Sequence, residues 1–357
     1  MRPRSSAAPT SERGYLGPAG RRVAVACLAA LLVALAFVSF TVGTYSMTAE
    51  QLLSTIRAFV AGSIADAETS RSVAVLFSIR IPRVLLACAV GAALAVSGAA
   101  YQGIFRNPMV SPDILGVSNA ASVGVALGLL WGFPTVVVHA MSFAFGIGAV
   151  ALVLLVSHVA TRRSADATLV MILSGVVIGS LGQAGLSLVK YIADPDNTLP
   201  AITYWLMGSF ARSGNAQNVL IMAGVLAVGS LTLLALRWRL NALSFGDEEA
   251  RSLGVDVRRC RLLVIAASTL MTAVSVCFCG VIGWVGLVIP HIVRLATGPD
   301  YRSLIPVCLL TGACFMLAVD DVARVLVPGE LPVGVLTALV GAPLFVYMLA
   351  RNQRRAY

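Results

Sequence analysis

Charged residues are scarce in this chain of 357 residues. Asp, Glu, Lys and Arg make up only 12% of it, whereas hydrophobic residues make up 58% and the mean hydropathy is +0.89. An ordinary soluble domain carries about 25% charged residues. The composition therefore excludes a soluble fold and predicts a membrane protein.

Lysine is almost missing, since Lys190 is the only one. The phosphate-binding motif of P-loop ATPases, G-x-x-x-x-G-K-[ST], requires a lysine, and Lys190 lies in the unrelated sequence Leu-Val-Lys-Tyr. The chain therefore has no P-loop. We expect that it is no enzyme, and that any ATP hydrolysis takes place on another chain.

Metal-finger spacing is missing from the seven cysteines. Cys277 and Cys279 form a C-x-C pair, which is open to two interpretations: a soft-metal site, or buried thiols that act as small apolar residues. We expect no metal and no cofactor. The positive residues behind the net charge of +10 form no single patch, because the arginines are spread between apolar runs. We therefore expect no nucleic-acid partner.

Long hydrophobic runs are what the chain has instead. A helix crosses a bilayer with about 20 apolar residues, and only the run at 281–296 is shorter than needed. The runs predict an all-α polytopic membrane protein of about ten spans, with one transmembrane domain at 23–350 between tails at 1–22 and 351–357. The ten runs are 23–44, 84–104, 114–131, 134–160, 168–190, 216–236, 260–279, 281–296, 303–319 and 333–350.

The basic residues predict the orientation. With ten spans and a cytoplasmic N-terminus, the cytoplasmic segments hold 19 of the 26 basic residues and the outer segments hold seven. Because positive charge favours the cytoplasmic side, we expect both tails there. The first run is longer than the apolar part of a signal peptide and no A-x-A site follows it, so we interpret it as an uncleaved span.

The connection at 237–261 is the longest and most charged of the expected inner connections. Ser244-x-x-Asp247 predicts a capping box, the acidic run from Asp247 suits the positive end of a helix dipole, and Gly254 predicts the helix end. The short helix is either a solvated face or a docking element for a cytoplasmic partner. Elsewhere, 45–79 is a mixed polar connection, and Ile202–Phe210 predicts a short interfacial helix.

Prolines interrupt the spans at two places. In Asn107-Pro108-Met109-Val110-Ser111-Pro112-Asp113 neither proline can donate to a helix ladder, so the backbone must unwind. This break either lines a watery cavity or forms a tight turn in which Asp113 caps the next helix. Pro290 would kink or end a half-span, and His291 beside it is a metal ligand, a proton relay or a structural hydrogen-bonding residue.

Charged residues crowd the end of the ninth run. Charges this close to the bilayer are functional candidates, and the chain has four here: Asp320, Asp321, Arg324 and Glu330. The simpler interpretation is a local ion pair between Asp320 and Arg324, which are four residues apart. Two further hypotheses rest here: an ion-coupled secondary transporter with Asp320 and Arg324 as a relay, and a membrane hydrolase using His291 and Asp320. The sequence lacks the inverted repeat that favours the former and a nucleophile motif for the latter.

Taken in order, these motifs resemble the FecCD family of ABC-importer permeases, which includes iron–siderophore and vitamin B12 permeases. The resemblance runs from about residue 79 to 350. Each motif is weak alone, and their shared order is specific. The landmarks are Arg80-Ile-Pro-Arg83, Gly91-Ala-Ala-Leu-Ala-Val-Ser-Gly98, Gln102 with Asn107-Pro108, Trp205-x-Met207-Gly208, Leu243-Ser-Phe-Gly246, Ala250-Arg-Ser-Leu-Gly254, Gly286-Leu-Val-Ile-Pro-His291, Glu330-Leu-Pro-Val-Gly334 and Gly341-Ala-Pro343.

The resemblance implies a type II ABC importer permease in the bacterial inner membrane. Its partners would be a second copy of the chain, two cytoplasmic ATP-binding subunits, an extracytoplasmic substrate-binding protein and membrane lipid. The expected cargo is an iron chelate, either a siderophore or haem, and cobalamin and molybdate are the alternatives.

The resemblance also implies roles for particular residues. Arg80, Arg83 and Arg324 would dock the binding protein, although Arg80 and Arg83 could instead snorkel at the interface. Asn107, Pro108 and Met109, where leucine is usual, would form a gate, and Thr168 matches a second gate loop only in part. The segment that couples to the ATPase falls at 240–257, with Ser244, Gly246, Asp247, Glu248, Ala250, Arg251, Leu253 and Gly254.

Overall fold

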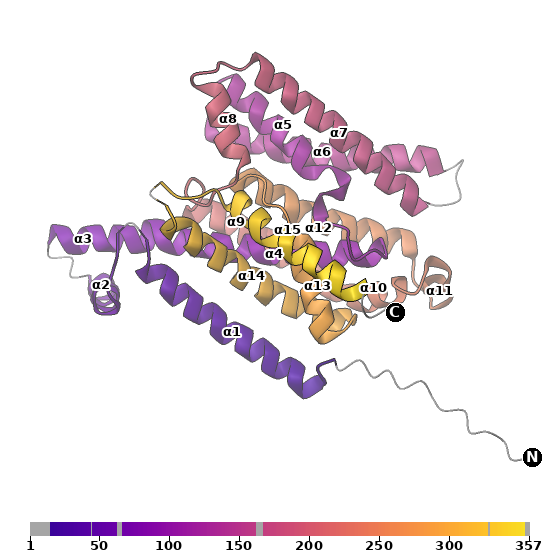
Figure 1. Cartoon of the computed structure of the whole chain (residues 1–357), viewed down its shortest axis with the longest axis horizontal. Coiled ribbons are helices and arrows are strands. Elements are labelled where there is room, and N and C mark those ends of the chain that lie inside the picture. The colour runs from indigo at the N-terminus through magenta and orange to yellow at the C-terminus, as the bar shows by residue number, and fades with distance from the viewer. Residues whose placement is uncertain (1–14, 44, 63–65, 162–166, 328, 354–357) are drawn as a thin grey trace, which may run out of the picture.

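The computed structural model of the chain describes residues 15–43, 45–62, 66–161, 167–327 and 329–353 (Figure 1). Every regular element in these ranges is a helix, which confirms the all-α prediction. Each of the ten predicted runs corresponds to one apolar helix. These helices are α1 (Pro18–Thr41), α4 (Ile81–Ile104), α5 (Val117–Leu130), α6 (Thr135–Thr161), α7 (Ala167–Ile192), α9 (Ala216–Ala235), α12 (Val257–Cys279), α13 (Val285–Thr297), α14 (Tyr301–Val325) and α15 (Val333–Gln353).

Seven helices in the described ranges are long and apolar enough to cross a membrane, and α5, α13 and α15 supply three shorter apolar segments. The short eighth run is α13, which spans 13 residues and continues through Pro290. The boundary predicted for the first span needs a shift, because α1 begins at Pro18 rather than at residue 23. Most of the predicted tails, 1–14 and 354–357, lies outside the described residues.

The connection predicted at 45–79 is helical in the structure. Its helices are α2 (Ala49–Ala61), α3 (Ala67–Val73) and the π-helical η1 (Ala74–Arg80). A capping box between Thr48 and Gln51 begins α2. Because η1 runs directly into α4, residues Ala67–Ile104 form one helix of 38 residues. Arg80 and Arg83 therefore lie inside a long helix and not at its start.

Four small helices complete the chain. They are η2 (Pro112–Leu115), α8 (Thr198–Leu206), α10 (Arg237–Leu243) and α11 (Asp247–Ser252). The predicted interfacial helix is α8, and it begins four residues before the expected Ile202. Figure 1 shows α2 and α3 at the left end of the molecule and α10 and α11 at the right end. We call these the α3 end and the α11 end.

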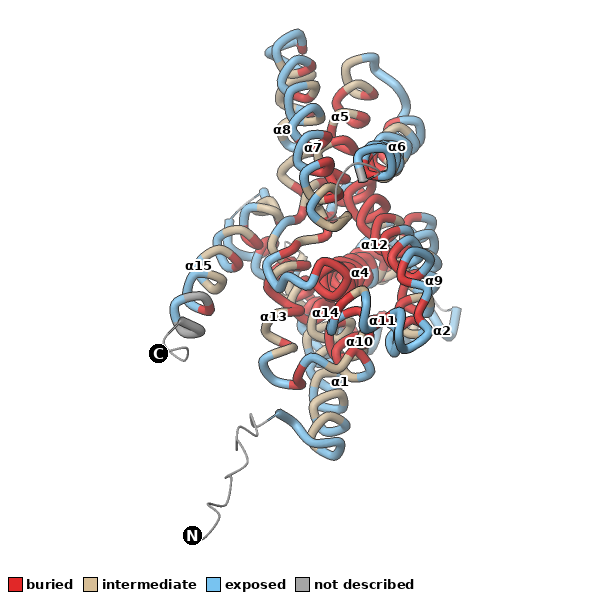
Figure 2. The backbone as a smooth tube through the Cα atoms, turned by 90° about the vertical axis from the view of Figure 1, so that its right-hand side faces the viewer, coloured by how far each residue is buried: buried red, intermediate tan, exposed pale blue. Residues whose placement is uncertain are grey.

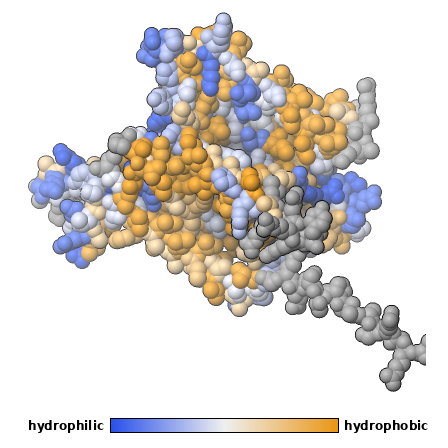
Figure 3. Space-filling model, viewed as in Figure 1, coloured by the Kyte–Doolittle hydropathy of each residue, from blue (hydrophilic) through white to orange (hydrophobic). Residues whose placement is uncertain are grey.

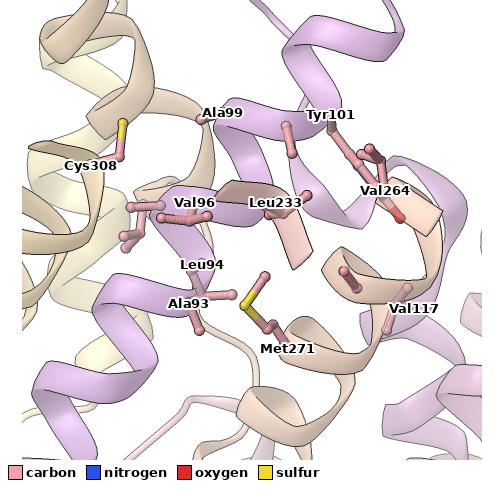
Figure 4. Packing of buried hydrophobic residues seen from close by; sticks show 14 of the residues in the cluster. Ala93, Leu94, Val96, Ala99, Tyr101, Val117, Leu233, Val264, Met271 and Cys308 are labelled. Carbon is pink, nitrogen blue, oxygen red and sulfur yellow. The ribbon is translucent and has the colours of Figure 1, made fainter. Parts of the chain in front are cut away.

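The core lies along α4, α12 and α14. Figure 2 shows α4 and α12 as almost entirely buried, whereas α7 and α15 are largely exposed. Within the span-forming part of each helix, 78% of α12 is buried but only 6% of α1. Figure 4 shows the packing around Val96, Leu94 and Met271. Figure 3 shows apolar side chains over the middle of the molecule and hydrophilic ones toward its α3 and α11 ends, as a membrane protein requires.

Glycines set the closest helix approaches. A Cβ added to Gly98 of α4 would lie 1.7 Å from the carbonyl oxygen of Gly286 in α13. Two further glycines behave alike: a Cβ at Gly124 would lie 2.6 Å from Met141 O, and one at Gly175 would lie 2.3 Å from Ile114 O. Only glycine allows backbones this close in a membrane bundle.

Candidate functional site

The three arginines predicted to dock a binding protein gather at the α3 end. Arg83 makes the most contacts. Its Nη2 lies 2.8 Å from Asp320 Oδ1, and its Nη1 lies 2.8 Å from Glu330 Oε1. The side chains of Arg83 and Asp320 are 8% and 0% exposed, whereas Glu330 is 29% exposed. Glu330 is therefore the partner that lies nearest to solvent.

Arg80 and Arg324 bind the last turn of α1. Arg80 donates to the carbonyl oxygens of Phe40 and Tyr45, and Arg324 donates to the carbonyl oxygen of Ser39 at 3.2 Å. Carbonyls at a helix end have no partner within their own helix, so the arginines satisfy groups that would otherwise be left unpaired. They fasten α1 to α4 and α14.

Arg324 also forms ion pairs within α14. Its Nε lies 3.5 Å from Asp320 Oδ2, which is the local pair expected from the spacing of four residues, and its Nη2 bonds Asp321. We call Arg80, Arg83, Asp320, Asp321, Arg324 and Glu330 the ionic cluster. Three positive and three negative groups balance, as buried charge requires. The three arginines are buried in this arrangement and do not form an exposed basic patch.

The predicted gate segment unwinds as the prolines require. Helix α4 ends at Ile104, and η2 begins at Pro112 after an irregular stretch. Asn107 Oδ1 accepts a 2.9 Å bond from the N–H of Met109, and the Met109 side chain is exposed. Asp113 caps the next helix, as the simpler interpretation proposed, because its carboxylate accepts from the N–H of Ser118 at 2.8 Å.

The predicted gate segment packs against α7, the helix that carries Thr168, the other residue predicted to belong to a gate. Gly116 follows η2, and a Cβ there would lie 3.0 Å from the backbone of Gly179 in α7. Thr168 lies half-buried in the first turn of that helix. A small cavity of about 120 Å³ lies behind η2, with Asp113, Thr272 and Ser275 among otherwise largely apolar walls.

Helix α11 begins differently from the prediction. Its N-cap is Gly246, at φ +140°, with no side-chain cap, so the capping box between Ser244 and Asp247 is wrong. The hydroxyl of Ser244 instead donates to Asn241 O at 2.6 Å, one turn back in α10. The acidic residues of the first turn and the end at Gly254, with φ +79°, are as predicted.

One face of α11 is anchored and the other is free. Ala250 is fully buried, and Asp247 lies 3.0 Å from Arg261 of α12. Phe245 and Leu253 point outward, with 75% and 54% of their surface exposed. Exposed apolar side chains beside a charged helix end are typical of a contact surface for another protein.

A polar link that the sequence did not suggest ties α10 to the start of α14. Asn241 Nδ2 donates to Asp300 Oδ1 at 2.7 Å, and Arg21 of α1 lies 3.8 Å from the same carboxyl group. Burial opposes ionisation, but the N–H of Arg302, the Asn241 amide and the nearby arginines together lower the pKa of Asp300. The start of α1 and the predicted coupling segment therefore lie at the same end of the molecule.

The thiols and histidines form no metal site among the described residues, where no group of three potential ligands occurs. The Cys277 thiol donates to His139 O at 3.1 Å, and Cys279 is buried. His291 is half-buried on α13. These positions fit packing roles for the C-x-C pair.

Comparisons with known proteins bear directly on this architecture. The model of the FecCD transport family matches residues 31–351. The chain is 42% identical to the molybdate import system permease protein MolB of Haemophilus influenzae, over 91% of this chain and 95% of that protein. It is 37% identical to the hemin transport system permease protein HmuU of Yersinia pestis, over 94% and 97% of the two chains.

A solved structure agrees. A metal-chelate type ABC transporter in an inward-facing conformation superposes with a TM-score of 0.80 and 40% identity, covering 92% of this chain and 98% of that one. The ten apolar helices, the broken segment after α4 and the exposed α11 thus occur in a chain that matches one family over nearly its whole length. The chain belongs to the FecCD transport family and is an ABC importer permease.

Proposed function

We propose that two copies of this chain form the membrane pathway of an importer that two cytoplasmic ATP-binding subunits drive. The observation that carries the proposal is the exposure of Phe245 and Leu253, which flank α11 at one end of a chain that has no P-loop. The carboxylate of Asp247 anchors this helix to α12, so a push on its exposed face would pass into the core.

The α11 end would then face the cytoplasm, and both termini with it, in the inner membrane of a bacterium. Arg21, Arg237, Arg239 and Arg251 lie at or near this end, which fits the preference of basic residues for the cytoplasmic side. A substrate-binding protein would dock at the α3 end. Since Arg83 already binds Glu330, an acidic partner would reach it by replacing that carboxylate.

The cargo we propose is an iron chelate, siderophore or haem. The relative named for hemin and the solved metal-chelate type transporter support this choice. The relative named for molybdate import supports an oxyanion as the second candidate. A relative in Halobacterium salinarum, 43% identical over 78% of this chain, is named for cobalamin. The cavity behind η2, of about 120 Å³, is too small for a chelate. The pathway that we propose runs between the two copies.

Reconstitution tests the proposal. The permease, the ATP-binding subunit and the binding protein are placed in liposomes, and uptake of radioactive iron chelate, haem, cobalamin and molybdate is measured with ATP and without it. We expect ATP-dependent uptake of the iron chelate. Uptake by the permease alone would overturn the ABC mechanism, and ATP-dependent uptake of molybdate only would establish the second cargo.

A further inference from the structure

A cavity of about 420 Å³ lies where α6, α7, α11 and α12 meet, at the α11 end. It belongs neither to the ionic cluster nor to the gate segment. Its walls combine charged side chains from α11 and α12 with a largely apolar surface from α6, α7 and α12, in which Ser157 and His158 of α6 are the polar members. We call it the α11 cavity.

The polar wall of the α11 cavity carries excess positive charge. Arg251, Arg258 and Arg261 line it, and Asp247 is the one carboxylate among the lining residues. The Nη2 of Arg261 lies 3.0 Å from that carboxylate, and the Arg261 side chain is 10% exposed. Within the described ranges, Arg251 and Arg258 form no ion pair. Among the residues that the structure describes, these two arginines therefore have no carboxylate within ion-pair distance.

One nitrogen in this wall has no partner at all. The Nε of Arg261 is fully buried and makes no hydrogen bond within the described structure. A buried charged donor without an acceptor is costly. An anionic group that enters the cavity would pair with the guanidinium groups that line it.

The other wall is apolar and continues onto a surface that faces hydrocarbon. Leu154, Met171 and Ile265 line the cavity, and just outside it Leu155 and Val159 of α6 are each 60% exposed. In a chain that spans a bilayer, exposed apolar side chains on a spanning helix lie against acyl chains. The cavity thus joins a cationic polar region to the lipid-facing side of α6.

We propose that the α11 cavity binds an anionic glycerophospholipid, with the phosphodiester headgroup at Arg258 and Arg261 and an acyl chain along α6 and α12. Arginine matches phosphate oxygens in a two-pronged geometry. Basic pockets between spanning helices are suited to anionic headgroups. A free oxyanion would use the arginines but leave the apolar wall uncovered, and a zwitterionic lipid would not balance the charge.

Such a lipid would sit against the contact that holds α11 in place. Asp247 is the anchor of α11 on α12, and Arg261 contacts both that anchor and the cavity. The headgroup would compete with Asp247 for the guanidinium and change how firmly α11 is held. This consequence rests on the proposed coupling role of α11, whereas lipid binding itself requires only a chain in a bilayer.

Native mass spectrometry of the purified full-length chain tests the proposal. The protein is titrated with phosphatidylglycerol and, separately, with phosphatidylcholine. We expect phosphatidylglycerol to bind about tenfold more tightly. Arg258→Glu should remove this preference. Arg259→Glu is the matched control, since Arg259 is next in sequence and 86% exposed, pairs with Asp256 and does not line the cavity. Arg251→Gln should weaken binding without reversing a charge.

The melting temperature of each variant is measured first, and only variants that melt like the parent are compared. Equal binding of both lipids would overturn the proposal, as would an equal loss of preference in the Arg259→Glu control. Displacement of the lipid by millimolar inorganic phosphate would show that the cavity is a site for a free oxyanion. A cavity that is covered in lipid-free dimers would show that a second copy of the chain occupies it. Either result would also overturn it. None of these measurements involves ATP or transport, so failure here leaves the proposed function untouched.

Discussion

Arg83 of α4 and Asp320 of α14 form a fully buried ion pair, with the Arg83 Nη2 2.8 Å from the Asp320 Oδ1. Asp320 also lies 3.5 Å from Arg324, so one carboxylate serves two guanidinium groups. Removing it would leave three positive groups and two negative groups in the cluster, and so one uncompensated buried charge. The ionic cluster is therefore a structural unit of this chain, whatever contacts it makes with a partner.

Asp320→Ala should destabilise the protein by about 3–5 kcal/mol, because breaking a buried pair leaves uncompensated charge. The free energy of unfolding in mixed micelles measures the effect. Arg259→Gln is the control, since it breaks the exposed pair with Asp256 and should change little. If both variants unfold alike, the ionic cluster does not hold the helices together.

Glu330→Gln tests whether docking of a binding protein exchanges carboxylates at Arg83. Removing the competing charge should strengthen binding of the substrate-binding protein by up to about fivefold, since a part-exposed pair is worth about 1 kcal/mol at most. Surface plasmon resonance at low and high salt measures the affinity. Glu50→Gln on exposed α2 is the control for a general change in charge. Unchanged or weaker binding in Glu330→Gln would contradict the exchange.

Gly98→Ala should destabilise the bundle by about 1–3 kcal/mol or more, because the new methyl group would overlap the backbone of Gly286 and force α4 from α13. Gly224→Ala in α9 is the matched control, since no atom lies within 4 Å of a Cβ there. Thermal unfolding followed by fluorescence size exclusion compares the two. Equal melting temperatures would show that α4 and α13 can separate without cost.

The spans could be predicted from the sequence because crossing a bilayer is a local property of about 20 residues. The helices at 49–80 could not, since α2 and α3 lack the long apolar run that marks a span and their local signals were only the caps at Thr48 and Asp66. Arg324 was a candidate because of its charge near the bilayer, and the docking role of all three arginines came from the resemblance. The burial of these arginines could not be predicted, because Glu330 lies 247 positions from Arg83 in the sequence and no local pattern indicates that the two residues pair.

Asp300 should make stability depend on pH at the α11 end. Its pKa is lowered from 3.8 in the folded state, so its contribution is present above the unfolded pKa and disappears as pH falls below about 3.8. Asp300→Asn should remove this acid-sensitive part and flatten the stability curve between about pH 5 and 3. Melting temperatures of both proteins across that range measure it. An identical slope in both proteins would place the acid sensitivity on other carboxylates.

The exposed face of α11 should decide whether the ATP-binding subunit stays bound. Phe245→Ala with Leu253→Ala removes two side chains that make little contact with the rest of the chain, so the melting temperature should stay near that of the parent. Apolar side chains at the centre of an interface commonly contribute 1–2 kcal/mol or more each, so the double variant should weaken binding by about tenfold or more.

Co-purification of the ATP-binding subunit, followed by titration in nanodiscs, measures that loss. Tyr204→Ala on α8 is the control: Tyr204 is 64% exposed and lies on a helix remote from α11 in Figure 1. If Tyr204→Ala releases the subunit as readily as the α11 variant does, the contact lies elsewhere. If only the α11 variant loses the subunit while its melting temperature holds, the short helix that ends at Gly254 is the point where ATP hydrolysis acts on this chain.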